Sequence, residues 1–179
     1  VLRTVLETSE LVVRCNPLFD GSKKEIDEIV ARGADRIMLP MFHTATEATH
    51  FVKLVNGRCK TTLLVETTGA LARLPDIANT QGITDIHIGL NDLHLALNLN
   101  FMFEILSGGL LDHMASILNE AGRCFGFGGV MPIGPGLLPA EQVLSEHYRL
   151  GSSQVILTRD FGKLLKSDDP DIAFKKAVD

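Results

Sequence analysis

The chain has 179 residues, a formal net charge of −5 and a composition that is 45% hydrophobic and 22% charged. These values are typical of a globular protein, and the length suffices for one domain with a sizeable core. No run of Lys and Arg marks a nucleic-acid surface, and no apolar segment approaches the length of a membrane span, so we expect neither partner. The three cysteines, Cys15, Cys59 and Cys124, lie far apart without a CxxC pair. This pattern favours free thiols in a cytoplasmic protein over a disulfide framework or a zinc site.

Six short apolar runs along the chain predict β-strands. They cover residues 10–15, 36–41, 62–66, 85–89, 125–131 and 154–158, and each is nearly continuous, as in parallel strands buried on both faces. Helix-like stretches lie between them. Two begin with the capping boxes Ser22–Glu25 and Thr44–Glu47, and a third covers 139–150, with Pro139 near its start and Gly151 just past its end.

This alternation of strands and helices predicts an α/β fold with a parallel sheet. Three polar residues, Arg14, Glu66 and Asp92, stand at or just after the ends of different strands. They favour a TIM (β/α)8 barrel, which builds its site from several strand ends, whereas a doubly wound sheet gathers its site at one switch point. A full barrel needs about 250 residues. We therefore interpret residues 1–179 as a single barrel domain with about six βα units that lacks the first two strands; an open six-unit sheet is the alternative.

Glu66 and Asp92 are the residues with the clearest chemical potential. They lie one βα unit apart, and neighbouring strands are about 4.8 Å apart, so both carboxylates could hold one small cation. An oxygen pair without His or Cys suits Mg²⁺ or Mn²⁺. Arg14 adds a planar set of donors for a substrate carboxylate. The alternative is that both acids cap the helices that follow them.

Four segments resemble the HpcH/HpaI aldolase and citrate lyase family, whose members are TIM barrels of the pyruvate/phosphoenolpyruvate type. They are VVRCNP (12–17), GADRIMLPM (33–41), LLVETTGAL (63–71) and DIHIGLNDLHLAL (85–97). The resemblance implies that Glu66 and Asp92 bind Mg²⁺ or Mn²⁺ and that Arg14 binds the carboxylate and keto oxygen of a pyruvate-like unit. It further implies that the backbone amides of Gly89, Leu90, Asn91 and Asp92 surround that carboxylate.

The activity implied by the resemblance is a divalent-metal-dependent carbon–carbon lyase of the class II aldolase type. Such an enzyme cleaves a 4-hydroxy-2-oxo acid to pyruvate and an aldehyde. One alternative is a citryl- or malyl-thioester (CoA) lyase, which acts on an acyl thioester. Another is a catalytically inactive barrel with a structural or ligand-sensing role.

Two positions depart from the aldolase pattern. Leu64 stands where the aldolase branch has a glutamine, and Ala31 stands at the position matched to the aspartate of its acid/base pair. His43, just after the second strand, is a possible acid/base; the alternative is a loop or interface residue. Arg159, after the last strand, either forms a structural ion pair or reaches the far end of a substrate.

The segment FMFEILSGG (101–109) is an apolar insertion in the longest interval between strands. An exposed apolar stretch suits a subunit interface, and members of the resembled family are commonly oligomeric. We therefore expect a homo-oligomer. His87 alternates with Ile86 and Ile88 and is predicted to be a core histidine.

Overall fold

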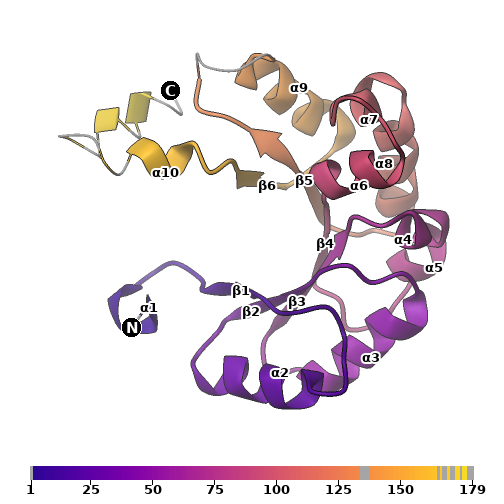
Figure 1. The fold of residues 1–179 in the computed structure, drawn as a ribbon, viewed down its shortest axis with the longest axis vertical. Helices are drawn as coiled ribbons and strands as arrows, with labels where there is room; N and C mark the ends of the chain where they lie inside the picture. Colours follow the sequence, from indigo (N-terminus) through magenta and orange to yellow (C-terminus); the bar gives the residue numbers. More distant parts are fainter. Residues whose placement is uncertain are drawn as a thin grey trace.

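The computed structural model describes residues 2–133, 138–164, 166, 169, 172–173 and 175–176. One parallel sheet forms its inner layer, and its six strands lie side by side in sequence order. The strands are β1 (Val12–Arg14), β2 (Arg36–Leu39), β3 (Lys60–Val65), β4 (Asp85–Ile88), β5 (Phe125–Val130) and β6 (Gln154–Leu157). Figure 1 shows that the sheet curves into a half-barrel, with an open concave side and helices around its convex side.

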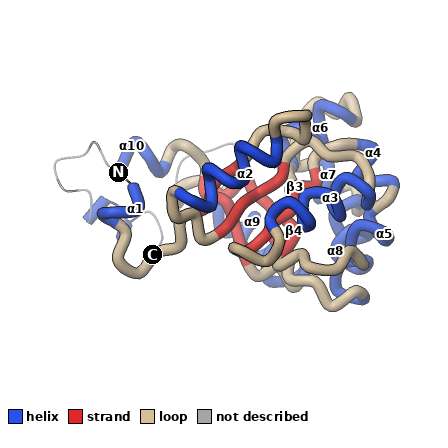
Figure 2. Tube along the Cα trace, turned by 90° about the horizontal axis from the view of Figure 1, so that it is seen from below, coloured by secondary structure: helices blue, strands red, loops and turns tan. Residues whose placement is uncertain are grey.

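Helices precede β1, lie between successive strands and follow β6. They are α1 (Leu2–Val5), α2 (Ser22–Ala31), α3 (Ala45–Val55), α4 (Thr68–Ala72), α5 (Leu74–Ala78), α6 (Leu90–Ala96), α7 (Glu104–Ser107), α8 (Leu110–Glu120), α9 (Ala140–Leu150) and α10 (Phe161–Leu164). In Figure 2, α1 and α10 lie at the opposite end of the molecule from α4, α5 and α8. Within the described part of the chain, no helix is long and apolar enough to cross a membrane.

The core fills the space between the sheet and these helices. Alternate residues of the central strands, among them Ile37, Leu39, Leu63 and Val65, are fully buried in one cluster with apolar side chains of the helices. A strand side chain points to the opposite face from its neighbours, so the intervening residues face the concave side. Glu66, which follows Val65, is therefore directed toward the interior of the half-barrel.

The predicted α/β class and all six predicted strands are confirmed. Closure into a (β/α)8 barrel is not confirmed, because β1 and β6 pair with no further strand among the described residues. The sequential parallel order is that of a barrel wound in one direction, and it contains no switch point. The sheet is thus a half-barrel, consistent with part of a TIM-like barrel.

The helix-end predictions are mostly confirmed. Thr44 Oγ1 accepts a hydrogen bond from the Glu47 backbone N–H at 3.2 Å, and α9 ends before Gly151. The capping box at Ser22 is wrong. Ser22 lies inside the first turn of α2, and its hydroxyl accepts a hydrogen bond from the backbone N–H of Phe19. Glu25 accepts instead from both the backbone and the side chain of Asn16.

Candidate active site

A cavity of about 630 Å³ opens at the carboxyl ends of the strands, on the concave side of the sheet. Its polar part is lined by residues from three strand ends: Arg14 at the end of β1, Glu66 after β3, and Gly89, Leu90, Asn91 and Asp92 after β4. The carboxyl ends of parallel strands meet at one edge of a sheet, which is where α/β folds build their sites. The fold thus brings together all the residues that the sequence assigned to metal and substrate binding.

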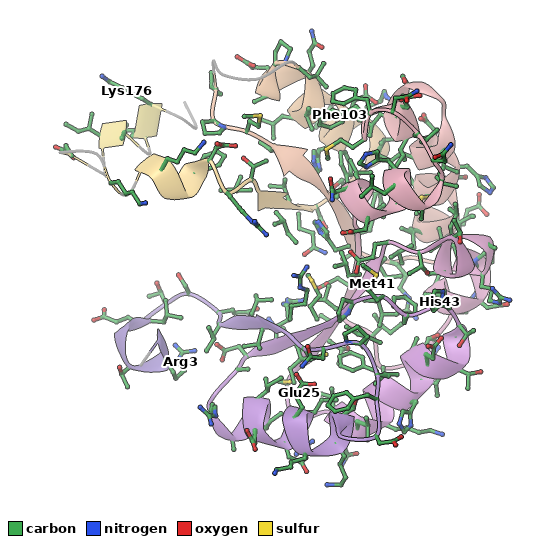
Figure 3. All side chains as sticks on the ribbon, viewed as in Figure 1. Arg3, Glu25, Met41, His43, Phe103 and Lys176 are labelled. Carbon is green, nitrogen blue, oxygen red and sulfur yellow. The ribbon has the colours of Figure 1, made fainter. Side chains whose placement is uncertain are left out.

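The position of Glu66 is fixed by its backbone neighbours. The side chain is only 3% exposed, and its Oε1 accepts a hydrogen bond from the Met41 N–H at 3.1 Å. Met41 has a φ of 52°, a left-handed conformation that few residues other than glycine adopt. Figure 3 labels Met41 closer to the sheet than His43. This unusual backbone turn therefore supplies a donor that orients the buried carboxylate.

Gly89 makes room for the same carboxylate. Val65 pairs with Ile88 in the sheet, which places Gly89 beside Glu66. A Cβ added at Gly89 would lie 2.8 Å from Glu66 Cβ and 2.9 Å from Glu66 Oε2. Any larger residue would push the carboxylate out of place. The glycine that interrupts the apolar run is therefore explained by close packing of the backbone against Glu66.

Burial raises the pKa of the Glu66 carboxyl to about 7, the largest of the influences on it. The hydrogen bond from Met41 lowers this pKa, and so does the positive charge of Arg14. The charge and the side-chain hydrogen bond of Asp92 raise it. The two carboxyl groups therefore interact directly, and they favour a shared proton or cation between them.

This pair fits a divalent cation such as Mg²⁺ or Mn²⁺. Both groups are carboxyls, one is buried, and the charge of Asp92 adds to burial in raising the pKa of Glu66, so a cation between them would offset their repulsion. The described residues contain no cluster of three or more His, Cys, Asp and Glu side chains that could hold a metal ion. The other coordination positions would fall to water and substrate oxygens, the usual arrangement for Mg²⁺.

His43 lies apart from this cavity. Its backbone N–H donates to Glu47 Oε2 at 3.0 Å, and its ring packs against α4, where a Cβ added at Gly69 would lie 2.8 Å from Nδ1. Figure 3 places His43 beyond Met41, toward the outer helices. It does not line the cavity. Ala31, at the exposed end of α2, does not line it either.

Several residues at the cavity were not assigned to the site by the sequence prediction, or were assigned to it only as one of two alternatives. Phe101, Met102 and Phe103, from the segment that the sequence prediction placed at a subunit interface, line the cavity. The sequence shows that these residues are apolar, but it does not show that they face a cavity. Met41 contributes through its backbone, which no side-chain pattern reveals. Arg159 also lines the cavity.

Two buried histidines lie at and behind the cavity. His87, which lines its floor, is 3% exposed, so its prediction as a core histidine is confirmed. His147 of α9 stacks on Phe127 with ring centroids 3.5 Å apart, and its Nδ1 lies 2.8 Å from Ser152 Oγ. Burial lowers the pKa of both imidazoles to about 4. Both are therefore neutral at pH 7.

Fold and site together define a half-barrel α/β protein with a carboxylate pair and an arginine at the carboxyl ends of its strands. The chain belongs to the HpcH/HpaI aldolase/citrate lyase family, whose sequence profile matches residues 2–102. No curated protein sequence gives a significant match.

Solved structures show the same fold. A family protein from Burkholderia cenocepacia J2315 is 17% identical, with a TM-score of 0.71 over 88% of this chain and 70% of that one. CitE from Mycobacterium tuberculosis, in complex with magnesium, acetoacetate and coenzyme A, is 19% identical, with a TM-score of 0.64 over 98% of this chain and 63% of that one. The citrate lyase beta subunit from M. tuberculosis, complexed with oxaloacetate and magnesium, is 18% identical, with a TM-score of 0.62 over 98% and 78%. This chain thus spans 63–78% of the length of these three proteins.

Proposed function

We propose that the protein is a divalent-metal-dependent carbon–carbon lyase that cleaves a 4-hydroxy-2-oxo acid to pyruvate and an aldehyde. The observation that carries this proposal is the juxtaposition of Glu66 and Asp92 in one cavity with Arg14. The magnesium in the complexes of CitE and the citrate lyase beta subunit supports the choice of cation. The oxaloacetate in the second complex is a small 2-oxo acid, and it supports the choice of substrate class.

Glu66 and Asp92 would hold the cation, Mg²⁺ or Mn²⁺. When bound, it supplies Lewis-acid stabilisation of the negative charge that develops on the 2-oxo acid as the carbon–carbon bond breaks. Met41 keeps Glu66 aimed at this position through its N–H, and Gly89 leaves the space that the carboxylate needs. The site is therefore arranged before substrate arrives, which lowers the reorganisation required during reaction.

Arg14 and the start of α6 would bind the oxo acid itself. The guanidinium offers parallel donors that match a carboxylate and its neighbouring keto oxygen. The backbone of Gly89 to Asp92 lines the same part of the cavity and would contribute N–H donors to the substrate carboxylate. Positive charge from Arg14 also favours the carboxylate form of Glu66, so one residue assists both cation and substrate binding.

Among the described residues, we assign no acid/base residue to the proposed reaction. Leu64, which lines the cavity two residues before Glu66, cannot hydrogen-bond a water molecule as a glutamine would. Neither Ala31 nor His43 lines the cavity. No lysine is among the described residues that line it, which disfavours a Schiff-base aldolase.

The thioester lyase is the second candidate, favoured by the coenzyme A in the CitE complex. It would use the same carboxylate pair and the same stabilisation of developing negative charge. The described cavity offers two cationic residues, Arg14 and Arg159, for the several phosphate charges of coenzyme A. We therefore place the free 2-oxo acid first.

Pyruvate release tests the proposal directly. The whole protein is supplied with 4-hydroxy-2-oxo acids, and pyruvate is followed by coupled reduction to lactate. We expect release that requires Mg²⁺ or Mn²⁺, stops with a chelator and is lost in Asp92→Asn but not in Asp76→Asn, a change on the exposed surface of α5. Release from citryl- or malyl-CoA alone would favour the second candidate. Cleavage of none of these substrates would favour the inactive barrel.

A further inference from the structure

The cavity has a second part whose chemistry differs from that of the carboxylate pair. Six apolar side chains line it: Phe101, Met102, Phe103, Leu138, Ile156 and Leu157, here called the apolar wall. Pyruvate is too small and too polar to need such a surface. A cavity of about 630 Å³ is also large for a three-carbon acid, since pockets of about 300–1,000 Å³ hold drug-sized ligands.

Local packing holds the apolar wall in place. The rings of Phe101 and Phe103 meet edge to face, with centroids 5.3 Å apart and planes at 73°. Gly129 has a φ of 100°, and a Cβ there would lie 2.9 Å from Phe103 Cζ and 3.1 Å from Met102 Cε. Glycine on β5 therefore makes room for these side chains beside the sheet. Figure 3 shows Phe103 on the half of the molecule that carries α6 and α7.

The charges near the apolar wall disfavour an anionic partner. A second cavity of about 600 Å³ shares Phe101, Phe103 and Leu138 with the first, so these three side chains form the boundary between the two. The charged residues that line this second cavity are Glu104 and Glu146. Glu104 Oε1 already accepts hydrogen bonds from two backbone N–H groups, at 2.9 and 2.7 Å. Glu146 is paired with Arg149, whose Nη2 lies 2.6 Å from its Oε2. The described residues that line the far side of the boundary therefore offer two carboxylates and no cation of their own.

Arg159 is a cationic residue that follows β6, the strand that carries Ile156 and Leu157 of the apolar wall. Its side chain is exposed, so a carboxylate would meet it in water, where an ion pair contributes little to binding. Burial of apolar surface, by contrast, is favourable in proportion to the area removed from water. The balance favours a neutral apolar group at this end of the cavity.

From this arrangement we infer that the acceptor half of the substrate is an apolar aldehyde, aliphatic or aromatic, rather than one that carries a carboxylate or several hydroxyls. This inference rests on the proposed function, since the oxo-acid end is bound by Arg14 and the cation pair. The carbon chain beyond C4 of the substrate lies against the apolar wall. The protein is accordingly selective for 4-hydroxy-2-oxo acids with a hydrocarbon substituent.

A matched pair of ligands tests this selectivity without turnover. 2-Oxooctanoate and 2-oxooctanedioate have the same chain length and differ in the terminal carboxylate. Titration calorimetry with the whole protein and Mn²⁺ compares their affinities. We expect 2-oxooctanoate to bind at least about tenfold more tightly, because its terminal methyl group can be buried against the apolar wall, whereas the terminal carboxylate of the dioate would lose its hydration there. Equal binding, or tighter binding of the dioate, would overturn the inference.

Three variants locate the effect. Ile156→Lys places a cation in the apolar wall and should remove or invert the preference. Leu144→Lys makes the same change at a similarly exposed position of α9 that does not line the cavity (Leu144 is 42% exposed and Ile156 46%), and it should leave the preference intact. Arg159→Gln should also leave the preference for 2-oxooctanoate intact. If the native protein instead prefers the dioate and Arg159→Gln abolishes that preference, Arg159 binds the far end of the substrate and the inference is overturned.

Oxalate separates failure of this inference from failure of the proposed function. It carries the two oxygens that a cation and Arg14 recognise but has no chain to reach the apolar wall. Mn²⁺-dependent oxalate binding without the predicted preference would overturn the apolar-aldehyde assignment alone. Absence of oxalate binding would overturn the proposed function, and the inference would fall with it.

Discussion

The raised pKa of Glu66 makes a quantitative prediction for the cation-free protein. A carboxyl whose folded pKa is about 7 and whose ordinary value is 4.5 binds its proton more tightly in the folded state than in the unfolded one. Its contribution to stability is therefore fully present below pH 4.5 and is lost as the pH rises through 7. Glu66 is 3% exposed but lines the open cavity, so modest solvent screening applies. Between pH 5 and pH 8 the loss amounts to about 2–3 kcal/mol.

The buried histidines make the free energy of unfolding depend on pH in the opposite direction, so their contribution must be removed by a comparison. The pKa of both His87 and His147 is lowered to about 4. The unfolded chain therefore binds more protons than the folded protein between about pH 4 and 6.5, and stability rises with pH there. Comparison with Glu66→Gln removes this contribution, because both proteins contain the same histidines. The substituted amide keeps the size of the side chain and cannot titrate.

Urea unfolding at pH 5, 6, 7 and 8 in the presence of a chelator provides the assay. The free energy of unfolding of the native protein, minus that of Glu66→Gln, should fall by about 2–3 kcal/mol across this range. Glu7→Gln, at an exposed position, should follow the native protein. A difference that does not vary with pH would refute the reasoning, because Glu66 would then titrate alike in the folded and unfolded states.

Three further substitutions probe separate parts of the account. Arg14→Ala should lower kcat/KM for pyruvate release by about 10²–10³-fold, the usual effect of removing one preorganised donor, with unchanged thermal stability as the control measurement. Gly89→Ala should weaken Mn²⁺ binding at least about tenfold, because the new Cβ would lie 2.8 Å from Glu66 Cβ; unchanged affinity would contradict the packing argument. Asp85→Ala should destabilise the fold by about 1–3 kcal/mol, since it removes the buried partner of Arg36 and of the Thr62 hydroxyl, while Glu10 stays 3.3 Å from Arg36. That loss is measured by urea unfolding, while Mn²⁺ affinity of the folded protein stays within about twofold; a fall in affinity would show that the two ends of the sheet are coupled.

The strands were predictable because each central strand is buried on both faces and is therefore nearly continuously apolar. Their parallel, sequential pairing followed from the helices between them. The capping box at Ser22 failed for a local reason: the hydroxyl and the Glu25 carboxylate both found donors in the preceding loop, at Phe19 and Asn16. Pattern rules cannot choose between such competing partners.

The polar side of the candidate site was predictable from strand ends alone. Arg14, Glu66 and Asp92 follow three strands, and parallel strands bring their ends together. His43 also follows a strand, yet the loop carries it outward against Gly69, and Met41 turns its backbone toward Glu66 instead. The direction of a loop depends on packing that the local sequence does not encode.

The apolar wall was less accessible to sequence reasoning. Phe101, Met102 and Phe103 were predicted to lie at a subunit interface because an exposed apolar stretch suits one, and no periodicity in this run indicates the cavity that it lines. Their packing against Gly129 joins residues that are distant in sequence and depends on an irregularity of β5 between Gly128 and Val130. Homo-oligomer formation and a cytoplasmic location stay predictions.

The most direct test of the central claim is Mn²⁺ binding to the whole protein, followed by EPR with and without oxalate. The account predicts specific binding that tightens when oxalate is added, that is lost in Asp92→Asn and that persists in Asp76→Asn. Absence of specific Mn²⁺ binding, or binding that survives Asp92→Asn unchanged, would contradict it. Glu66 and Asp92 would then share only a proton, and the cavity would need a different chemistry.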